Sequence, residues 1–371
     1  MKAIAIVPGT ANVALVERPE PTVAASDDIK LKVLAVGICG TDREEVRGGR
    51  AAAPAGSPNL VLGHEMFGQV VEVGKSVTRV KPGDYAVFTV RRGCGTCVSC
   101  AMNRPDQCST GQYHERGIWG LDGYQCSFVV DKEQYVVHVP DELKDVGVLC
   151  EPLSVAEKAI DEAVRVQLAR LPAAPATPLW LHGRRCLIAG LGPIGLLAAL
   201  ALRLRGADVF GIDIVGADTP RPRWLTAIGG QYLDARTVAD GKLGEMAGLM
   251  DLIFDATGVP SVEFNLLDAL GPNGIYVLTG VPGGDRPLEV PGAEIIRRLV
   301  LNNQGMLGSV NAARDHYQMA VDDLVQARYR WGDHVNKLIS QRYPYDQFAI
   351  AFDSHNVADI KVTIDWSGSS P

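Results

Sequence analysis

The stretch RRCLIAGLGPIGLLAALALRLRGADVFGID (residues 184–213) decides the fold class of this chain. It reads as an apolar strand, a glycine-rich turn, a helix and a second strand. Gly190, Gly192 and Gly195 form the pattern G-x-G-x-x-G, and Asp213 ends the second strand 18 residues after Gly195. The first two glycines permit a tight turn against a pyrophosphate, and the third permits close packing of helix on strand. In this context the pattern predicts a dinucleotide-binding unit.

The second half of the chain continues this alternation of strands and helices. Six segments are expected to be parallel strands of one sheet: CLIAG, ADVFGID, QYLDA, DLIFDATG, GIYVLTG and NQGMLGSV. The apolar run of 17 residues from Cys186 to Leu202 has a membrane span as its alternative reading. Its Gly-x-Gly-Pro interruption and flanking arginines make it too short and too broken to cross roughly 30 Å of hydrocarbon. We therefore expect a doubly wound dinucleotide-binding domain over residues 152–311.

The first part of the chain has short strand-like runs between Gly, Pro and Asp turns. The runs KAIAIV, IKLKVLAVG, GQVVEVG, YAVFTV, QCSFVV and YVVHVP are typical of a β-barrel-like domain. A helical stripe follows over about residues 151–166, and the Pro/Ala-rich stretch 171–178 ends it. Beyond residue 312, a helix and mixed strands end in IKVTIDW, which is expected to pair back with the first domain. The predicted catalytic domain is therefore 1–151, completed by 312–371, with the active site in the cleft between the domains.

Composition and charge exclude several classes of protein. A chain of 371 residues should hold about two domains, and 47% hydrophobic residues are ample for large cores. The net charge of −7, without a basic block, argues against nucleic acid or an anionic membrane as a partner. The N-terminus, MKAIAIVPGT, has a five-residue apolar stretch before Pro8, which predicts no signal peptide. We therefore expect a cytoplasmic enzyme with no membrane partner.

Four cysteines lie within the fifteen-residue segment CGTCVSCAMNRPDQC, with the spacing C-x2-C-x2-C-x7-C. Tetrahedral zinc held by four thiolates is the ordinary use of such a cluster, and a closed site of this kind is structural. An iron–sulfur cluster is the main alternative, but its usual run has a third spacing of three residues and a proline after the last cysteine. Disulfides are a second alternative, although the other four cysteines are scattered along the chain. The predicted zinc ligands are Cys94, Cys97, Cys100 and Cys108.

A second and different set of metal-binding residues lies upstream and downstream of this loop. Cys39 stands in GICGTD, and His64 and Glu65 stand in GHE, each after a strand or before one. A thiolate, an imidazole and a carboxylate suit zinc with one position left open for substrate or water. Taken singly, a buried cysteine or histidine is more often part of the core. Glu151 in LCEPLSV is a further carboxylate, whose alternative role is a helix-start acid beside Pro152.

Several of these segments, in their order along the chain, resemble the zinc-dependent medium-chain alcohol and polyol dehydrogenase family. They are GICGTD, GHE, the four-cysteine loop, EPLSV and GLGPIG, and the resemblance covers essentially the whole chain. Within the family, TVRRGC, TGQYHERGI, VLCEPLSVAEKAI and GSVNA are most similar to the glucose 1-dehydrogenase subfamily. The resemblance implies a split β-barrel-like (GroES-like) catalytic domain and a doubly wound Rossmann domain with a six-stranded parallel sheet.

The resemblance also implies roles for particular residues. Cys39, His64 and Glu65 would be catalytic-zinc ligands, and Glu151 a fourth ligand or a group at the zinc-bound water. Thr41, Glu115, Glu151 and Asn311 would contact the sugar, with Thr41 and Glu151 also serving in proton transfer. Many relatives carry a relay histidine three residues after the Thr41 position, where this chain has Glu44, so a histidine relay is not expected. The expected dinucleotide-binding residues are Gly190, Gly192, Pro193, Ile194, Gly195, Asp213, Thr257 and Gly280.

The expected reaction is hydride transfer from C1 of an aldose, D-glucose first and D-galactose next, to NAD or NADP, giving the aldonolactone. We expect two zinc ions per chain and a homo-oligomer, dimer or tetramer. Asp213 favours NAD because its charge would repel a 2′-phosphate, whereas Arg221 and Arg223 in TPRPRW leave NADP as a second cofactor. One alternative is a polyol dehydrogenase of the sorbitol type. A more remote alternative is a non-catalytic sensor that binds zinc and a dinucleotide on the same fold.

Overall fold

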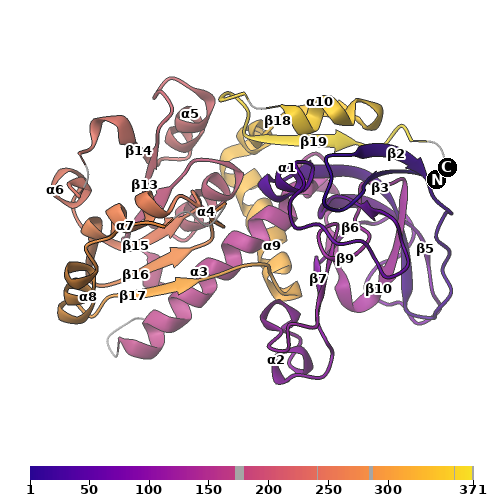
Figure 1. Ribbon diagram of the computed structural model, residues 1–371, viewed down its shortest axis with the longest axis horizontal. Helices are drawn as coiled ribbons and strands as arrows, with labels where there is room; N and C mark the ends of the chain where they lie inside the picture. The colour runs from indigo at the N-terminus through magenta and orange to yellow at the C-terminus, as the bar shows by residue number, and fades with distance from the viewer. Residues whose placement is uncertain (172–178, 240, 284–286, 355, 370–371) are drawn as a thin grey trace. The chain divides into compact units, whose positions relative to one another are not determined.

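The computed structural model describes residues 1–171, 179–239, 241–283, 287–354 and 356–369. The chain forms two compact units (Figure 1). The first comprises Met1–Ser154, Asn311–Tyr329 and Val335–Pro371, and the second comprises Val155–Val310 and Arg330–His334. Within the described residues, no helix is long and apolar enough to cross a membrane.

The second unit contains a six-stranded parallel sheet in the order β14-β13-β12-β15-β16-β17 (Figure 1). The six strands predicted from the apolar runs are therefore confirmed. Their bounds are β12 Arg185–Ala189, β13 Asp208–Asp213, β14 Gln231–Asp234, β15 Met250–Asp255, β16 Leu270–Leu278 and β17 Gly305–Gly308. The central strands are nearly continuous apolar runs because parallel strands are covered on both faces. Among the described residues, the α-helices that lie wholly in this unit are α4 Pro193–Leu204, α5 Pro220–Ala227, α6 Leu243–Ala247, α7 Pro260–Asn265 and α8 Gly292–Leu301.

The first unit is built on a seven-stranded sheet in the order β11-β6-β5-β3-β19-β18, with β10 also paired to β3. The last strand of the chain, β19, pairs antiparallel with β3, from Val362 opposite Ile38 to Asp365 opposite Ala35. The prediction that IKVTIDW returns to the first domain is therefore confirmed. The strand bounds are β3 Asp28–Ile38, β5 Glu65–Val73, β6 Tyr85–Phe88, β10 Phe128–Lys132, β11 Val136–Val139, β18 Ile339–Pro344 and β19 Lys361–Asp365.

Two small sheets complete the first unit, in the orders β2-β1-β4 and β7-β8-β9. Their strands are β1 Lys2–Ile6, β2 Val13–Glu17, β4 Leu60–Val61, β7 Arg91–Arg92, β8 His114–Arg116 and β9 Gly120–Leu121. The predicted strand QCSFVV begins three residues late, at Phe128. The reason is that the preceding backbone bonds to other segments: Ile4 N–H donates to the Gln125 carbonyl at 2.8 Å, and Gln125 N–H donates to Leu62 at 2.8 Å.

The other α-helices of the described part of the chain are α1 Gly40–Glu45, α2 Val98–Ala101, α3 Cys150–Arg170, α9 Arg314–Trp331 and α10 Phe348–Asp353. The helix expected over residues 151–166 is α3, which is four residues longer at its C-terminal end. The Pro/Ala-rich stretch that was expected to end it falls mostly on residues 172–178, which lie outside the described residues.

Candidate active site and metal centres

Cys39, His64 and Glu65 lie together in the first unit, with one ligand atom of each within 4.8 Å of the others. Cys39 follows β3 and precedes the first residue of α1, whereas Glu65 is the first residue of β5. The two strands are neighbours, and their register places Gly37 opposite Glu65. A Cβ atom at residue 37 would lie 2.0 Å from Glu65 Oε2, so a glycine is needed for the carboxylate to reach this position.

A buried carboxylate, Asp42, supports two members of this cluster. Its Oδ2 accepts the backbone N–H of Cys39 at 2.8 Å, and its Oδ1 lies 3.5 Å from Nδ1 of His64. Burial opposes charge on the imidazole, but Asp42 and Cys39 outweigh it and raise the pKa of His64 well above its usual value. A carboxylate behind a histidine is the usual support of a metal ligand. Sequence reasoning missed Asp42, although it is the acid three residues after Cys39 in GICGTD.

A second supporting residue, Lys361 of β19, contacts Glu65. Its Nζ donates to Oε1 at 2.7 Å and to Oε2 at 2.6 Å, and also to the Ile38 carbonyl at 3.1 Å. Only 2% of Lys361 is exposed, so this cation is held entirely by its partners. Burial opposes the ammonium charge, but Glu65 outweighs it and raises the pKa of Lys361. No sequence pattern pointed to this residue, because it is 296 positions from Glu65.

The remaining residues expected at this centre lie close to it. Glu151, in the first turn of α3, is buried, and burial raises its pKa to about 8, with His64 opposing and Glu65 reinforcing the shift. Its carboxylate is not part of the group whose ligand atoms lie within 4.8 Å. The Thr41 hydroxyl oxygen lies 4.0 Å from the Cys39 sulfur.

The donor set of this cluster fits a zinc ion. One thiolate, one imidazole and one carboxylate come from buried or half-buried side chains, and the mixed N/S/O set with fewer than four close ligands is that of an open zinc site. Within the described part of the chain, His64 Nδ1 and Asp42 Oδ1 are buried and have only their mutual contact at 3.5 Å, which is not a full hydrogen bond. The arrangement can therefore accept a cation that leaves one coordination position for another molecule.

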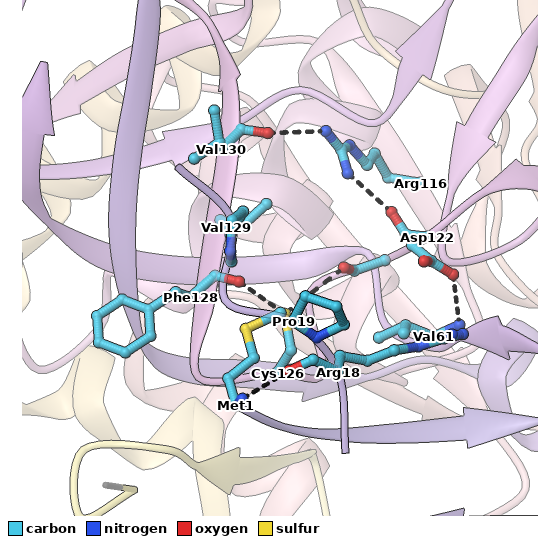
Figure 2. A pocket seen from close by; sticks show the side chains of 12 residues that line it. Met1, Arg18, Pro19, Val61, Arg116, Asp122, Cys126, Phe128, Val129 and Val130 are labelled. Carbon is cyan, nitrogen blue, oxygen red and sulfur yellow. Dashed lines mark hydrogen bonds between the residues drawn. The ribbon is translucent and has the colours of Figure 1, made fainter. Parts of the chain in front are cut away.

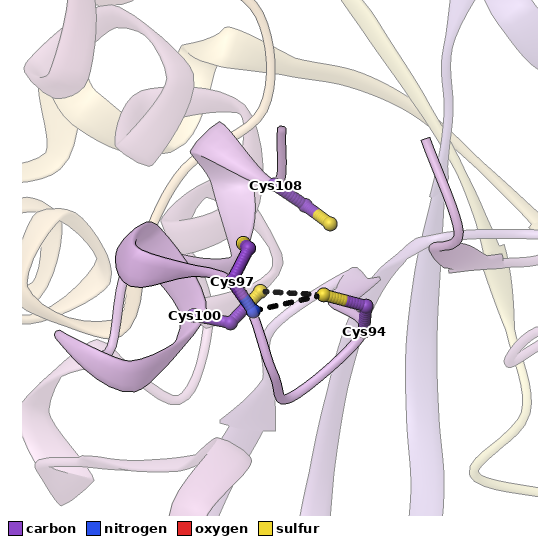
Figure 3. Close-up of side chains that lie close together, drawn as sticks. All are labelled: Cys94, Cys97, Cys100 and Cys108. Carbon is purple, nitrogen blue, oxygen red and sulfur yellow. Dashed lines mark hydrogen bonds between the residues drawn. The ribbon is translucent and has the colours of Figure 1, made fainter. Parts of the chain in front are cut away.

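The four-cysteine loop also brings its sulfurs together (Figure 3). All four Sγ atoms lie within 4.8 Å of one another, and those of Cys94 and Cys100 are 3.9 Å apart. Tetrahedral zinc with Zn–S bonds of about 2.3 Å requires sulfurs about 3.8 Å apart, so the loop fits this ion. Hydrogen bonds from Thr110 and Thr96 lower the pKa of the Cys94 thiol to about 5, which favours the thiolate that a metal needs. All eight cysteines of the chain are free.

The two residues expected to contact the sugar, Glu115 and Asn311, bond to each other. Glu115 lies in β8 and is 2% exposed, and Asn311 has a left-handed backbone with φ of 63°. The Asn311 side-chain amide donates to Glu115 Oε1, although 196 residues separate the two. The same oxygen accepts from Arg91 Nε at 3.1 Å and Nη2 at 2.9 Å. The structure therefore adds Arg91, which sequence reasoning did not name as a site residue.

The glycine-rich turn of the second unit joins β12 to α4. Gly190 has φ of +83°, and a Cβ atom at Gly195 would lie 1.9 Å from the Gly190 carbonyl oxygen, so the helix can pack on the turn only with a glycine there. Pro193 and Ile194 are the first two residues of α4. The Asp213 carboxylate accepts the Leu191 N–H at 2.7 Å, which places it beside the turn.

Thr257 and Gly280, the other two expected dinucleotide contacts, follow neighbouring parallel strands. A Cβ atom at Gly190 would lie 3.1 Å from the Thr257 methyl carbon, so Thr257 is beside the glycine-rich turn. Its hydroxyl donates to Asp255 at 2.6 Å. A Cβ atom at Gly280 would meet the Gly258 nitrogen at 2.1 Å. The carboxyl ends of parallel strands thus bring the expected cofactor residues of this unit to one edge of the sheet, where such sheets bind ligands.

A cavity of about 330 Å³ in the first unit contains none of these residues (Figure 2). Its lining includes Met1, Arg18, Arg116, Cys126 and Phe128. Polar groups of the wall bond to one another: Arg116 donates to the Asp122 carbonyl at 2.9 Å, and the Cys126 thiol donates to the Phe128 carbonyl at 3.2 Å. We therefore assign no catalytic role to this cavity.

Comparisons with known proteins agree with this arrangement. Residues 144–366 match the family model described as glucose dehydrogenase C-terminus, and residues 25–141 match that of the alcohol dehydrogenase GroES-like domain. Glucose 1-dehydrogenase of Methanocella arvoryzae is 36% identical over 346 residues, covering 92% of this chain and 93% of that protein. Glucose 1-dehydrogenase 1 of Caldivirga maquilingensis is 38% identical over 372 residues, covering 98% and 99%.

Among solved structures, Haloferax mediterranei glucose dehydrogenase in complex with NADP, Zn and gluconolactone has a TM-score of 0.87. It is 31% identical, and the match covers 98% of this chain and 99% of that one. The two groups of candidate metal ligands, the glycine-rich turn and these full-length matches lead to the same conclusion. The chain belongs to the zinc-dependent medium-chain alcohol and polyol dehydrogenase family, in its glucose dehydrogenase branch.

Proposed function

We propose that this protein is a zinc-dependent glucose 1-dehydrogenase that oxidises D-glucose, and secondarily D-galactose, at C1 and transfers the hydride to NAD(P). The observation that carries the proposal is the presence in one unit of the buried Cys39–His64–Glu65 cluster and the Glu115–Asn311 pair. A zinc site alone would suit any alcohol, whereas a buried carboxylate and an amide offer hydrogen-bond partners for a substrate with several hydroxyls. We further propose that the first unit is the catalytic domain and the second binds the dinucleotide.

The residues of the first unit divide the chemistry between them. Zinc held by Cys39, His64 and Glu65 would supply the Lewis acidity that lets an unactivated sugar hydroxyl lose its proton near neutral pH. Glu115 and Asn311 would hold and orient the sugar through its hydroxyl groups. The bound dinucleotide would supply the acceptor for the C1 hydrogen and its electron pair, and the hydroxyl proton would pass to a base of the protein. Glu151, whose pKa is raised to about 8, is suited to hold that proton, directly or through the Thr41 hydroxyl.

The cofactor set of the proposal is two zinc ions per chain and NAD in preference to NADP. The two clusters have different ligand types and different surroundings, which supports separate structural and catalytic roles. Asp213 supports the NAD preference because its carboxylate lies beside the glycine-rich turn, where it would repel a 2′-phosphate. Arg221 and Arg223 lie in the first turn of α5 and support use of NADP as the second cofactor.

We also propose a homo-oligomer located in the cytoplasm. In the sheet order of the second unit β17 is a terminal strand, and the nearby sequence of α8 has exposed apolar side chains at Ile296, Val300 and Leu301. An unpaired edge and a group of exposed apolar residues are features of a surface that another subunit covers. Cysteines that are grouped for a metal, rather than paired in disulfides, support a reducing compartment.

The test of the function is an initial-rate assay against a panel of aldoses and polyols, each with NAD and with NADP. We expect D-glucose to have the highest kcat/KM. Glu115→Gln and Asn311→Ala should lower kcat/KM for glucose by the equivalent of roughly 1–3 kcal/mol, with the KM for the dinucleotide nearly unchanged. If sorbitol or ethanol is oxidised faster than every aldose, the glucose assignment is wrong and the polyol alternative replaces it. If protein that is fully loaded with zinc oxidises none of these substrates, the non-catalytic sensor is the favoured alternative.

A further inference from the structure

Arg91 of β7 uses its whole guanidinium group to join two segments of the first unit. Nε and Nη2 donate to Glu115 Oε1 at 3.1 and 2.9 Å, and Nη1 donates to the Asp106 backbone carbonyl at 2.8 Å. The guanidinium also stacks on the Tyr113 ring, with its carbon 4.1 Å from the ring centroid. Arg91 is 7% exposed and Glu115 2% exposed, so water cannot replace these contacts.

Asp106 belongs to the four-cysteine loop. It lies between Cys100 and Cys108, in the short 3-10 helix Pro105–Gln107. Its side chain is held by Arg104, with Nη2 and Oδ2 2.7 Å apart, and only 3% of the residue is exposed. The position of the Asp106 carbonyl therefore depends on the fold of the loop, and the fold of a loop this short depends on its metal.

The other end of the link is the carboxylate proposed to bind the sugar. Both donors from Arg91 and the amide of Asn311 converge on Oε1 of Glu115. Within the described residues, none donates to Oε2, so one oxygen is anchored and the other is left for a hydroxyl. A carboxylate anchored through one oxygen has a fixed orientation, and such preorganisation is what a hydrogen bond to a substrate requires.

We propose that Arg91 is a positioning residue through which the four-cysteine loop sets the orientation of Glu115, so that the loop metal acts on sugar recognition as well as on stability. The proposal rests on the proposed function, in which Glu115 binds the sugar. The role needs an arginine, because only a planar fork can hold one oxygen with two N–H groups and reach a carbonyl with a third. A lysine at this position can satisfy one partner and must release the other.

The chain provides a matched control in the next residue. Arg92 follows Arg91 on the same short strand, β7, and is 9% exposed. Its Nη2 lies 2.5 Å from Oδ2 of Asp131. Arg91→Lys and Arg92→Lys therefore make the same chemical change at two buried arginines, of which only the first contacts Glu115 and the loop. Any general effect of losing a buried guanidinium will be common to both variants.

The first experiment compares sugar kinetics of the two variants. Arg91→Lys should raise the KM for glucose about tenfold or more, with kcat and the KM for NAD changed far less, because a sugar partner is misplaced. Across singly deoxygenated glucoses, it should lose discrimination at one hydroxyl only. Arg92→Lys should retain the wild-type KM and discrimination. A wild-type KM and wild-type discrimination in Arg91→Lys would overturn the proposal.

The second experiment measures zinc release to a colorimetric chelator, with Cys97→Ser identifying the phase that belongs to the loop. Release from the loop should be several-fold faster in Arg91→Lys than in Arg92→Lys. Coupling between two sites is reciprocal, so saturating D-glucose should slow this phase in wild-type protein, and L-glucose should not. This wild-type measurement remains informative if the variant does not fold.

The outcomes separate the two proposals. Wild-type protein that does not oxidise glucose contradicts the proposed function, while the effect of Arg91→Lys on zinc release still tests the link to the loop. Wild-type protein that oxidises glucose, but whose loop zinc is released at the same rate with and without the sugar, overturns the inference alone.

Discussion

Lys361 and Glu65 form a buried ion pair in which one ammonium group donates to both oxygens of the carboxylate. Glu65 is also one of the three residues of the proposed catalytic zinc site. The same carboxylate therefore contacts a protein cation and is a proposed ligand of the metal. In the absence of metal, Lys361 is the positive charge closest to Glu65 among the described residues, because the two groups are in direct contact.

Replacement of this lysine should destabilise the metal-free protein most. Lys361→Met should lower the free energy of unfolding by about 3–5 kcal/mol when the Cys39–His64–Glu65 cluster is empty, because a buried carboxylate loses its partner. The loss should shrink when zinc is bound there, since the ion compensates the same charge. Urea unfolding with and without zinc measures both values. Lys30→Met is the control, because its partner Glu20 is 37% exposed; equal losses with and without zinc at Lys361 would contradict this explanation.

Loss of one cysteine from the loop should remove one zinc ion and destabilise the protein. In Cys97→Ser, the zinc content measured by elemental analysis should fall from two ions per chain to one. The variant should also aggregate at a lower temperature than wild type, because structural zinc contributes directly to folding. Cys126→Ala is the control, since Cys126 is buried outside both clusters, and it should retain both ions. A single zinc ion per chain in fully active wild-type protein would refute the two-site proposal.

Replacement of the proposed zinc-binding histidine should abolish turnover and leave the fold largely intact. His64→Ala removes a proposed ligand of the catalytic zinc. Because this zinc would stabilise the transition state by several kcal/mol, turnover should fall by about 10³-fold or more. Circular dichroism and kcat measured on the same preparation test the separation of fold from activity. His138→Ala, at an exposed position of β11, should retain wild-type values. Substantial activity in His64→Ala would remove this residue from the site.

Neutralising Asp213 should shift the preference between the two cofactors. Asp213→Asn should lower kcat/KM for NAD and raise it for NADP, because the charge that opposes a 2′-phosphate is lost while the shape is kept. Asp208→Asn, at the exposed start of the same strand, should change neither value. The measurement is the ratio of the two kcat/KM values. Wild-type protein with a kcat/KM for NADP tenfold above that for NAD would contradict the proposed preference.

A buried carboxyl in α1 should make stability depend on pH near neutrality. Burial raises the pKa of Glu45 from 4.5 to about 7, and the neighbouring Glu44 and Asp42 act in the same direction. The folded state therefore binds this proton more tightly than the unfolded state, so the contribution of Glu45 to stability falls as pH rises from 4.5 to 7 and is level above. Glu45→Gln should be more stable than wild type by about 1–3 kcal/mol at pH 8, with the pH-dependent part of this difference lost below pH 4.5.

The control for this pH dependence is Glu44→Gln, the adjacent and exposed acid. Urea unfolding at a series of pH values compares the two variants with wild type. Glu44→Gln should keep the fall in stability between pH 4.5 and 7, because it leaves the buried Glu45 carboxyl in place. A parallel pair of curves for wild type and Glu45→Gln would show that Glu45 does not ionise in this range.

The sequence by itself determined those features whose parts lie close together along the chain. The turn from Gly190 to Gly195 is set by local backbone requirements, and the six strands of the second unit could be predicted because each is a short apolar run with a helix or turn after it. The four-cysteine loop is another local feature, since metal-ligand spacing within fifteen residues restricts what it can bind.

Only the tertiary structure decided which distant residues meet. Lys361 reaches Glu65 because β19 lies on one side of β3 and β5 lies on the other, and Asn311 reaches Glu115 across 196 residues. Neither Lys361 nor Arg91 stands in a motif with a chemical meaning of its own. Strand order and register are set by how the whole sheet buries its apolar faces, and a one-residue change in register would turn these side chains away from each other. Periodicity in a sequence reports which face of a strand is buried, but not which strand becomes its neighbour.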